Sequence, residues 1–347
     1  MVTAVFDPHD MMKETSNIVN DLEESIDVDL GLSKMDYANV LICGMGGSAI
    51  GGDIVANCLY TYSDRQIKVL RFPELPNWAS GETLILVSSY SGNTAETLSV
   101  YDQAVKRGCR IIAISSGGKL EEKALSDGVP FIKVRAGLQP RNAVGYSIGY
   151  LFNAIASIGG PDIRDEIRES IPMLKRYVSS LMPLDSKPRA IAGEISGSLP
   201  VIYSSSSLSA IAGRWRAQFN ENSKIIAFDG ILPDTNHGDI IGLVESDGLK
   251  VKPIILVEET QTKLMKKSVN STISTLKSRG LKPYVIRISG KSVFEREMQA
   301  MMLGDFVSLH LAFFKDIDPS DIEPISLLKK LLSWNMGKSK KTRRTKR

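Results

Sequence analysis

Short apolar runs alternate with helical patterns through the first 134 residues of the chain. The runs have the length and the branched side chains of buried parallel strands, and the segments between them carry apolar residues at helical spacing. This alternation predicts an α/β fold in which helices cover both faces of a parallel sheet. The expected strands are 38–43, 67–72, 83–88, 108–116 and 131–134, and the expected helices are 49–60, 94–107 and 119–126.

The same pattern begins again in the second half. Three short matches follow in the same order at offsets of 161 to 173 residues: 209–213 repeats 48–52, 253–257 repeats 83–87, and 280–290 repeats 108–117. They predict a duplicated α/β domain.

Two helical segments, 142–158 and 161–182, precede the second copy and read as polar enough to bridge two bodies. Pro183 and Pro188 then mark a boundary. We therefore expect four parts: a first domain over 1–158, a helical connection over 159–188, a second domain with C-terminal helices over 189–336, and a disordered basic tail over 337–347.

A hydroxyl-rich turn, SSYSGNT at residues 88–94, follows the expected strand 83–88. A helical pattern begins after Thr94, which is suited to an N-cap. A helix N-terminus offers unpaired N–H groups and partial positive charge, Gly92 lets the backbone approach a ligand closely, and the hydroxyls add donors. The turn therefore predicts a phosphate site, and the alternative is a turn that only caps its helix. In the second copy Glu258-Glu259-Thr260 stands at this place, so we expect one such site per chain.

The turn after the first strand leaves another interpretation open. Residues 44–49, GMGGSA, fit the G-x-G-x-x-A pattern of dinucleotide sites. The next strand ends at Arg71 rather than at an acidic residue for a ribose hydroxyl, and Arg71 would favour NADP. A glycine-rich turn beside a sugar-phosphate pocket explains both turns, because open α/β sheets bind ligands at the carboxyl ends of their strands. An NADP-dependent oxidoreductase stays as the less favoured alternative.

Arg141 and Glu221 are candidates for catalysis. Arg141 follows a proline in a short loop, which suits a fixed guanidinium that stabilises an oxyanion, although a surface arginine fits equally well. Glu221 stands where a helix ends, and the negative end of the helix dipole disfavours its ionised form, so that it becomes a better general base. The alternative for Glu221 is a solvated side chain. One face of this helix is expected to be buried through Ile211, Trp215 and Phe219.

His237 and Lys329 are weaker candidates. His237 lies in a loop rich in turn residues, beside Asn236 and Asp239, and could be an acid–base group or a surface residue. Lys329 lies on a C-terminal helix from residue 322, closer than Lys330 to an expected inward stripe of Ile325, Leu328 and Leu332. Paired lysines on a helix are more commonly solvated.

Composition and charge narrow the classes of protein. The chain has 347 residues, of which 43% are hydrophobic and 24% charged, and no apolar run is long enough to span a membrane. Three scattered cysteines and three distant histidines give neither a disulfide framework nor a zinc motif, which favours a cytoplasmic protein without a metal. The last ten residues hold seven positive charges, and without them the net charge of +4 becomes −3. Nucleic-acid binding is therefore not expected beyond that tail.

These motifs together resemble the archaeal-type bifunctional phosphoglucose/phosphomannose isomerase family. SYSGNTAET matches the signature of the sugar-isomerase (SIS) domain, and GMGGSAIGGD, QPR, RWRAQFNENSK, NHGD and ISLLKKLL extend the likeness over about residues 35–335. The resemblance implies two doubly wound, flavodoxin-like SIS domains and a homodimer with a composite active site. It also implies hexose 6-phosphate substrates and catalysis without metal or cofactor.

The resemblance also assigns roles. It implies that Arg141 stabilises a cis-enediolate, that Glu221 moves a proton between C1 and C2, and that His237, from the partner subunit, opens the sugar ring with Lys329. The phosphate would be held by Ser48, Ser89, Ser91 and Thr94, with Gly47 and Tyr90 lining the pocket. The family usually has Asn-Glu after the histidine, whereas this chain has Gly238-Asp239. A non-catalytic sugar-phosphate sensor is the other alternative, since SIS domains also serve as regulators.

Overall fold

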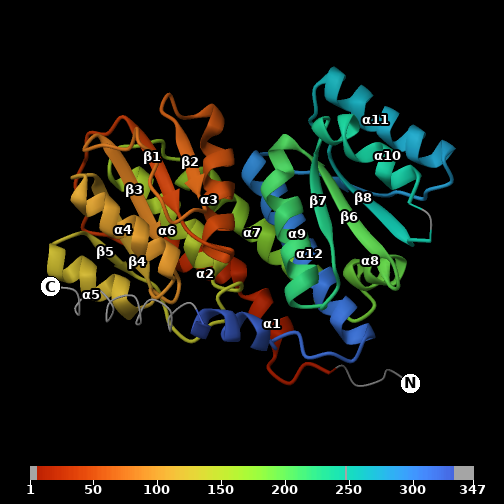
Figure 1. Ribbon diagram of the computed structural model, residues 1–347, viewed down its shortest axis with the longest axis horizontal. Coiled ribbons are helices and arrows are strands. Elements are labelled where there is room, and N and C mark those ends of the chain that lie inside the picture. Colours follow the sequence, from red (N-terminus) through yellow and green to blue (C-terminus); the bar gives the residue numbers. More distant parts are fainter. Residues whose placement is uncertain (1–5, 247, 332–347) are drawn as a thin grey trace, which may run out of the picture.

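A computed structural model describes residues 6–246 and 248–331. Its first sheet is parallel, in the order β2-β1-β3-β4-β5, and the helices between its strands are α3 (Gly47–Cys58), α4 (Ala95–Lys106) and α5 (Gly118–Asp127) (Figure 1). The strands are β1 (Asn39–Cys43), β2 (Ile67–Leu70), β3 (Thr83–Ser88), β4 (Arg110–Ser115) and β5 (Phe131–Lys133). The predicted alternation is confirmed, with strand bounds that differ by up to two residues.

The second sheet repeats this topology in the order β7-β6-β8-β9, again with parallel pairing. Its helices are α9 (Ser209–Glu221), α10 (Asp239–Val244), α11 (Lys263–Ser278) and α12 (Val293–Phe314), and its strands are β6 (Leu199–Ser205), β7 (Phe228–Leu232), β8 (Val251–Glu258) and β9 (Tyr284–Ile288). Strands β6 to β9 therefore correspond in order to β1 to β4. The sequence reading missed β7, because this edge strand is mostly exposed and has no apolar run.

A layer of helices lies between the two sheets and is shared by both (Figure 1). It consists of α1 (Met11–Ser16), α2 (Ile18–Ile26), α6 (Val144–Ser157) and α7 (Arg164–Leu181), together with α12, and α8 (Lys187–Ile195) packs against α12 beside the second sheet. One hydrophobic core runs through these helices and both sheets.

The expectation that 142–158 is a polar bridge is wrong, because α6 is buried along most of its length. A Cβ atom at Gly145 would lie 2.3 Å from the carbonyl oxygen of Ile18, so glycine there allows α2 and α6 to pack closely. The predicted domain bounds stay a prediction, and the expected tail over 337–347 lies outside the described residues.

The part of the chain that the structure describes also has three 3-10 turns: η1 (Leu59–Thr61), η2 (Ser206–Leu208) and η3 (Asp234–His237). Residues 323–331 are helical. Among the helices of the described residues, none has the length and apolar character needed to cross a membrane.

Candidate active site between the two sheets

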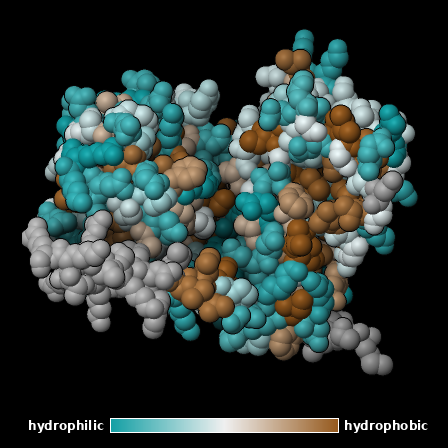
Figure 2. All heavy atoms as spheres, in the orientation of Figure 1, coloured by the Kyte–Doolittle hydropathy of each residue, from teal (hydrophilic) through white to brown (hydrophobic). Residues whose placement is uncertain are grey.

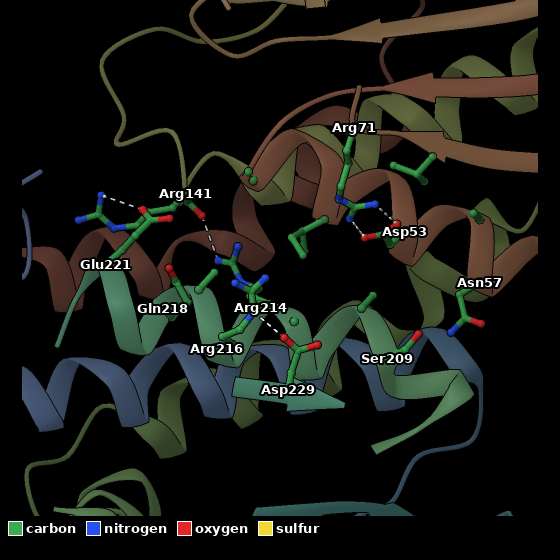
Figure 3. Close-up of a pocket in the computed structure, with 18 of the residues that line it drawn as sticks. Asp53, Asn57, Arg71, Arg141, Ser209, Arg214, Arg216, Gln218, Glu221 and Asp229 are labelled. Atoms are coloured by element: carbon green, nitrogen blue, oxygen red, sulfur yellow. Dashed lines mark hydrogen bonds and ion pairs between the residues drawn. The ribbon is translucent and has the colours of Figure 1, made fainter. Parts of the chain in front are cut away.

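A cavity of about 760 Å³ lies between α3 of the first half and α9 of the second (Figure 3). Helix α3 contributes residues from Gly47 to Asn57 and α9 contributes residues from Ser209 to Glu221, so the cavity runs along both helices. Arg141 closes the end near Gly47, and the Asp53–Arg71 and Arg216–Asp229 ion pairs line it farther along. The cavity thus lies at the carboxyl side of β1, where this class of sheet binds ligands.

Arg141 and Glu221 face each other in this cavity. The Arg141 side chain is 5% exposed, and its Nη1 lies 3.9 Å from Oε2 of Glu221, whose side chain is 31% exposed (Figure 3). Burial lowers the pKa of Arg141, while the nearby Glu221 carboxylate opposes this shift. The pair places a fixed positive group beside a carboxylate that solvent can reach, as proton transfer with oxyanion stabilisation requires.

Three hydrogen bonds fix the region of Arg141. Its Nε donates to Oδ1 of Asn222 at 2.8 Å, and its Nη2 donates to the carbonyl of Pro319 at 2.8 Å. The carbonyl of Arg141 accepts a bond of 3.0 Å from Arg214, which is itself paired with Asp305 at 2.8 Å in the core. The guanidinium is therefore held before any ligand binds.

The loop before Arg141 is also held from the N-terminal side. The amide of Gln139 donates to Oε1 of Glu14 in α1 at 2.6 Å, and the amide of Leu138 donates to the Tyr90 hydroxyl at 2.8 Å. A Cβ atom at Gly47 would lie 2.9 Å from the carbonyl oxygen of Pro140, so only glycine lets the β1–α3 turn approach this loop so closely.

The hydroxyl-rich turn forms as predicted after β3. Thr94 is the N-cap of α4, but its side chain makes no capping bond and instead accepts from the Ser89 hydroxyl at 3.0 Å. The capping-only alternative gains no support, because these hydroxyls leave the first N–H groups of α4 without a side-chain cap. Ser91 is exposed, whereas Ser89 is buried.

Gly92 has φ of +64°, and a Cβ atom there would lie 1.7 Å from the carbonyl oxygen of Gly117. The turn after β3 is therefore locked against the turn after β4. A small neighbouring cavity is lined by Gly47, Ser48 and Tyr90, so the two turns meet at Gly47, which also lines the large cavity.

His237 and Lys329 do not line the cavity of this chain. His237 is exposed at the end of η3, where Asn236 anchors the loop by accepting from Thr272 of α11 at 2.9 Å. Lys329 is exposed on the helical segment 323–331. The expected inward stripe there is wrong for Leu328, which is 58% exposed, and Leu332 lies outside the described residues. The roles of His237 and Lys329 stay predictions.

Lys224 was missed by the sequence reading. Its ammonium donates to the carbonyls of Glu221 at 2.6 Å, Asp321 at 2.7 Å and Pro319 at 3.4 Å, and burial lowers its pKa. It therefore joins the end of α9 to the segment that leads into the C-terminal helix. Arg214, Gln218 and Glu221 recur at helical spacing on the cavity side of α9, and this spacing could have identified the first two.

Arg71, which the dinucleotide alternative assigns to NADP, is paired with Asp53 of α3. Arg71 and Asp53 both line the large cavity between α3 and α9. Within residues 6–246 and 248–331, no group of three or more His, Cys, Asp or Glu side chains is arranged to hold a metal ion.

Comparison with known proteins points to one family. Residues 184–332 match the family model described as the bacterial phospho-glucose isomerase C-terminal SIS domain. The bifunctional phosphoglucose/phosphomannose isomerase of Aquifex aeolicus is 33% identical over 88% of this chain and 93% of its own, and that of Thermoplasma acidophilum is 33% identical over 92% and 98%. A hypothetical protein from Thermus thermophilus has the same fold, with a TM-score of 0.75 and 15% identity over 95% of this chain and 91% of its own. The chain belongs to the bifunctional phosphoglucose/phosphomannose isomerase family.

Proposed function

We propose that this protein interconverts glucose 6-phosphate or mannose 6-phosphate and fructose 6-phosphate through a cis-enediolate. The observation that carries the proposal is the placement of Arg141 and Glu221 in one cavity, beside the Gly47 turn that joins it to the hydroxyl-rich turn. Membership of the isomerase family supports the same reaction.

The substrate phosphate would bind at the N-terminus of α4. Its oxygens would accept from the hydroxyls of Ser48, Ser89, Ser91 and Thr94 and from the free N–H groups of the helix. Gly47 and Tyr90 would line this end of the site. Because the phosphate carries no part of the bond changes, its binding energy would serve to orient C1 and C2 at the other end of the sugar.

Glu221 would act as the base. Its carboxylate would take the proton from C2 of the open-chain aldose, the C2–H electron pair would form the C1–C2 double bond, and the carbonyl oxygen on C1 would take the negative charge. Arg141 would stabilise this oxyanion. The hydroxyl proton on O2 would pass to O1, and Glu221 would return its proton to C1 as O2 forms the C2 carbonyl of the ketose. No other reactant is needed, because atoms and electrons balance within the sugar.

Ring opening would require a second subunit. His237 lies outside the cavity of its own chain, on the side of the second sheet where β7 is an exposed edge strand. Figure 2 shows apolar side chains gathered on this half of the molecule. In the segment that contains β7 and α10, exposed hydrophobic side chains are Ile226, Phe228, Ile231 and Ile241. An apolar face beside a polar loop is typical of a subunit interface. We therefore infer a homodimer in which the partner's His237 completes the site with Lys329, or with Lys330.

Proton NMR in D₂O tests the reaction. Either aldose 6-phosphate should give fructose 6-phosphate with deuterium at C1, and the recovered aldose should carry deuterium at C2. Glu221→Gln should lower the exchange rate by about 10² to 10⁴, whereas Glu194→Gln at an exposed pair with Lys252 should leave it unchanged.

Binding of sugar phosphate without exchange in the unmodified protein would overturn the proposal and favour the sensor alternative. An absorbance change that depends on a nicotinamide nucleotide would favour the oxidoreductase. Sedimentation of a monomer at the protein concentrations that give full activity would overturn the composite site alone.

A further inference from the structure

The second sheet keeps the geometry of the phosphate end of the first sheet. Ser88, the last residue of β3, pairs with Ile114 of β4, and Glu258, the last residue of β8, pairs with Ile288 of β9. Glu258 therefore occupies the place of Ser88. In the first half, the space between the β1–α3 and β3–α4 turns is a small cavity that Ser48 and Ser88 line.

In the second half the corresponding space is filled by the chain itself. The side chain of Glu258 reaches from the end of β8 to the serine-rich turn between β6 and α9. Its Oε2 accepts from the Ser205 hydroxyl at 3.2 Å and from the Ser207 hydroxyl, and its Oε1 accepts from Nε of Arg296 at 3.2 Å. Two hydroxyls and a guanidinium around one oxyanion are the ligands that a phosphate site uses.

This cluster is buried. The Glu258 and Arg296 side chains are 7% and 9% exposed, and Ser205 is 3% exposed. Arg296 belongs to α12, and its Nη1 also donates to the carbonyl of Gly290 at 3.0 Å. The guanidinium is thus held in place by the turn after β9 as well as by Glu258.

A second carboxyl group lies nearby but does not share this role. Glu297 is fully buried and accepts from Asn57 at 2.6 Å and from Cys58 at 3.2 Å. Burial raises the pKa of Glu297 to about 8, and the charge of Glu258 contributes to this shift. Glu258 is therefore the carboxylate that pairs with Arg296, and Glu297 binds to Asn57 and Cys58 of the first half instead.

We propose that the carboxyl end of the second sheet is a second oxyanion site whose ligand is the carboxylate of Glu258. The duplicated turns retain an anion-binding arrangement, and Glu258 occupies it permanently. A carboxylate or phosphate from solution therefore has access only to the site of the first half. This inference concerns the second half alone and does not depend on the proposed reaction.

Chemical rescue tests the proposal. Glu258→Ala should lower the melting temperature, because Arg296 and two serines lose their shared partner. Sodium acetate or formate should then restore it with saturation, by about 2 °C at an anion concentration tenfold above the dissociation constant. Sodium chloride at equal ionic strength should not. Glu194→Ala, at an exposed glutamate, serves as the matched control for general salt effects.

A second variant tests whether acetate binds to the cation Arg296 or only fills the space that the Glu258 side chain leaves. Adding Arg296→Met to Glu258→Ala should abolish the acetate effect, because the cation is gone. If Glu258→Ala does not fold, Glu258→Gln keeps the side-chain shape without the charge, and its melting temperature should lie below that of the unmodified protein. An acetate response equal to that of chloride, or one that survives the loss of Arg296, would overturn the proposal.

Discussion

The ion pair between Arg214 and Asp305 offers the sharpest test of how the site is held. Both side chains are almost fully buried, at 3% and 1% exposure, and their closest atoms lie 2.8 Å apart. Asp305 also accepts from Gln218 at 3.1 Å, and Arg214 also donates to the carbonyl of Arg141. The pair therefore connects α9 and α12 to the loop that carries Arg141.

Replacement of Asp305 by leucine would leave a buried guanidinium without its counter-charge. Loss of one partner of a buried pair costs roughly 3–5 kcal/mol. For a chain of 347 residues one kcal/mol corresponds to about 1.4 °C, so the melting temperature should fall by about 4–7 °C. Because Arg214 would then be displaced from the carbonyl of Arg141, kcat should fall more than KM rises.

The double variant Arg214→Leu, Asp305→Leu separates stability from positioning. Two apolar side chains can replace a buried pair at little cost, so most of the lost melting temperature should return. Activity should stay low, because the carbonyl of Arg141 still lacks its donor. Calorimetry and initial rates measure the two quantities. A fall of less than about 2 °C in the single variant, or full activity in the double variant, would refute this reasoning.

Three other predictions follow from single residues. Gly92→Ala would bring a Cβ atom into the Gly117 carbonyl. Its main effect should be a higher KM for sugar phosphates, and its effect on the melting temperature should be small. Lys224→Met should lower kcat by roughly tenfold, because the end of α9 and the C-terminal helix would be displaced. Lys224→Arg should restore part of the lost kcat, and Lys133→Met should leave kcat unchanged. Burial, with the charge of Arg189, lowers the pKa of His310 from 6.5 to about 4, so the unfolded chain binds the proton first and stability falls as pH drops from 6.5 to 4. His310→Phe should remove this loss of stability, which is on the order of 3 kcal/mol between pH 6.5 and pH 4. Denaturant unfolding at a series of pH values measures it.

The fold and the hydroxyl-rich turn after β3 could be predicted because their signals are local. A buried parallel strand has a continuous apolar run, and the turn after β3 has its hydroxyls and glycine within seven residues. Strand β7 could not be found in this way, since an exposed edge strand has no such run. The error at α6 has a related cause: its small and hydroxyl-bearing residues fit against α2 by close backbone packing, which composition alone does not show.

The hydrogen bonds that hold the candidate catalytic residues could not be predicted, because they join distant parts of the chain. Arg141 bonds to Asn222 and to the carbonyl of Pro319, which are 81 and 178 residues away, and no periodic pattern encodes such a contact. The sequence reading identified Arg141 and Glu221 separately, and only the fold places them together.

The duplication explains why the two halves contribute different chemistry. Helices α3 and α9 follow equivalent strands, β1 and β6, but they contribute opposite helix termini to the same end of the cavity. Helix α3 contributes Gly47 at its N-terminus, and α9 contributes Glu221 at its C-terminus. A helix N-terminus favours an anion and a C-terminus disfavours one. In the proposed reaction the phosphate would accordingly bind in the first half, at the N-terminus of α4 beside the Gly47 turn, and the proton-accepting carboxylate would come from the second half. An occupied oxyanion site at Glu258 is consistent with this division, because the second half then needs no ligand of its own at its strand ends.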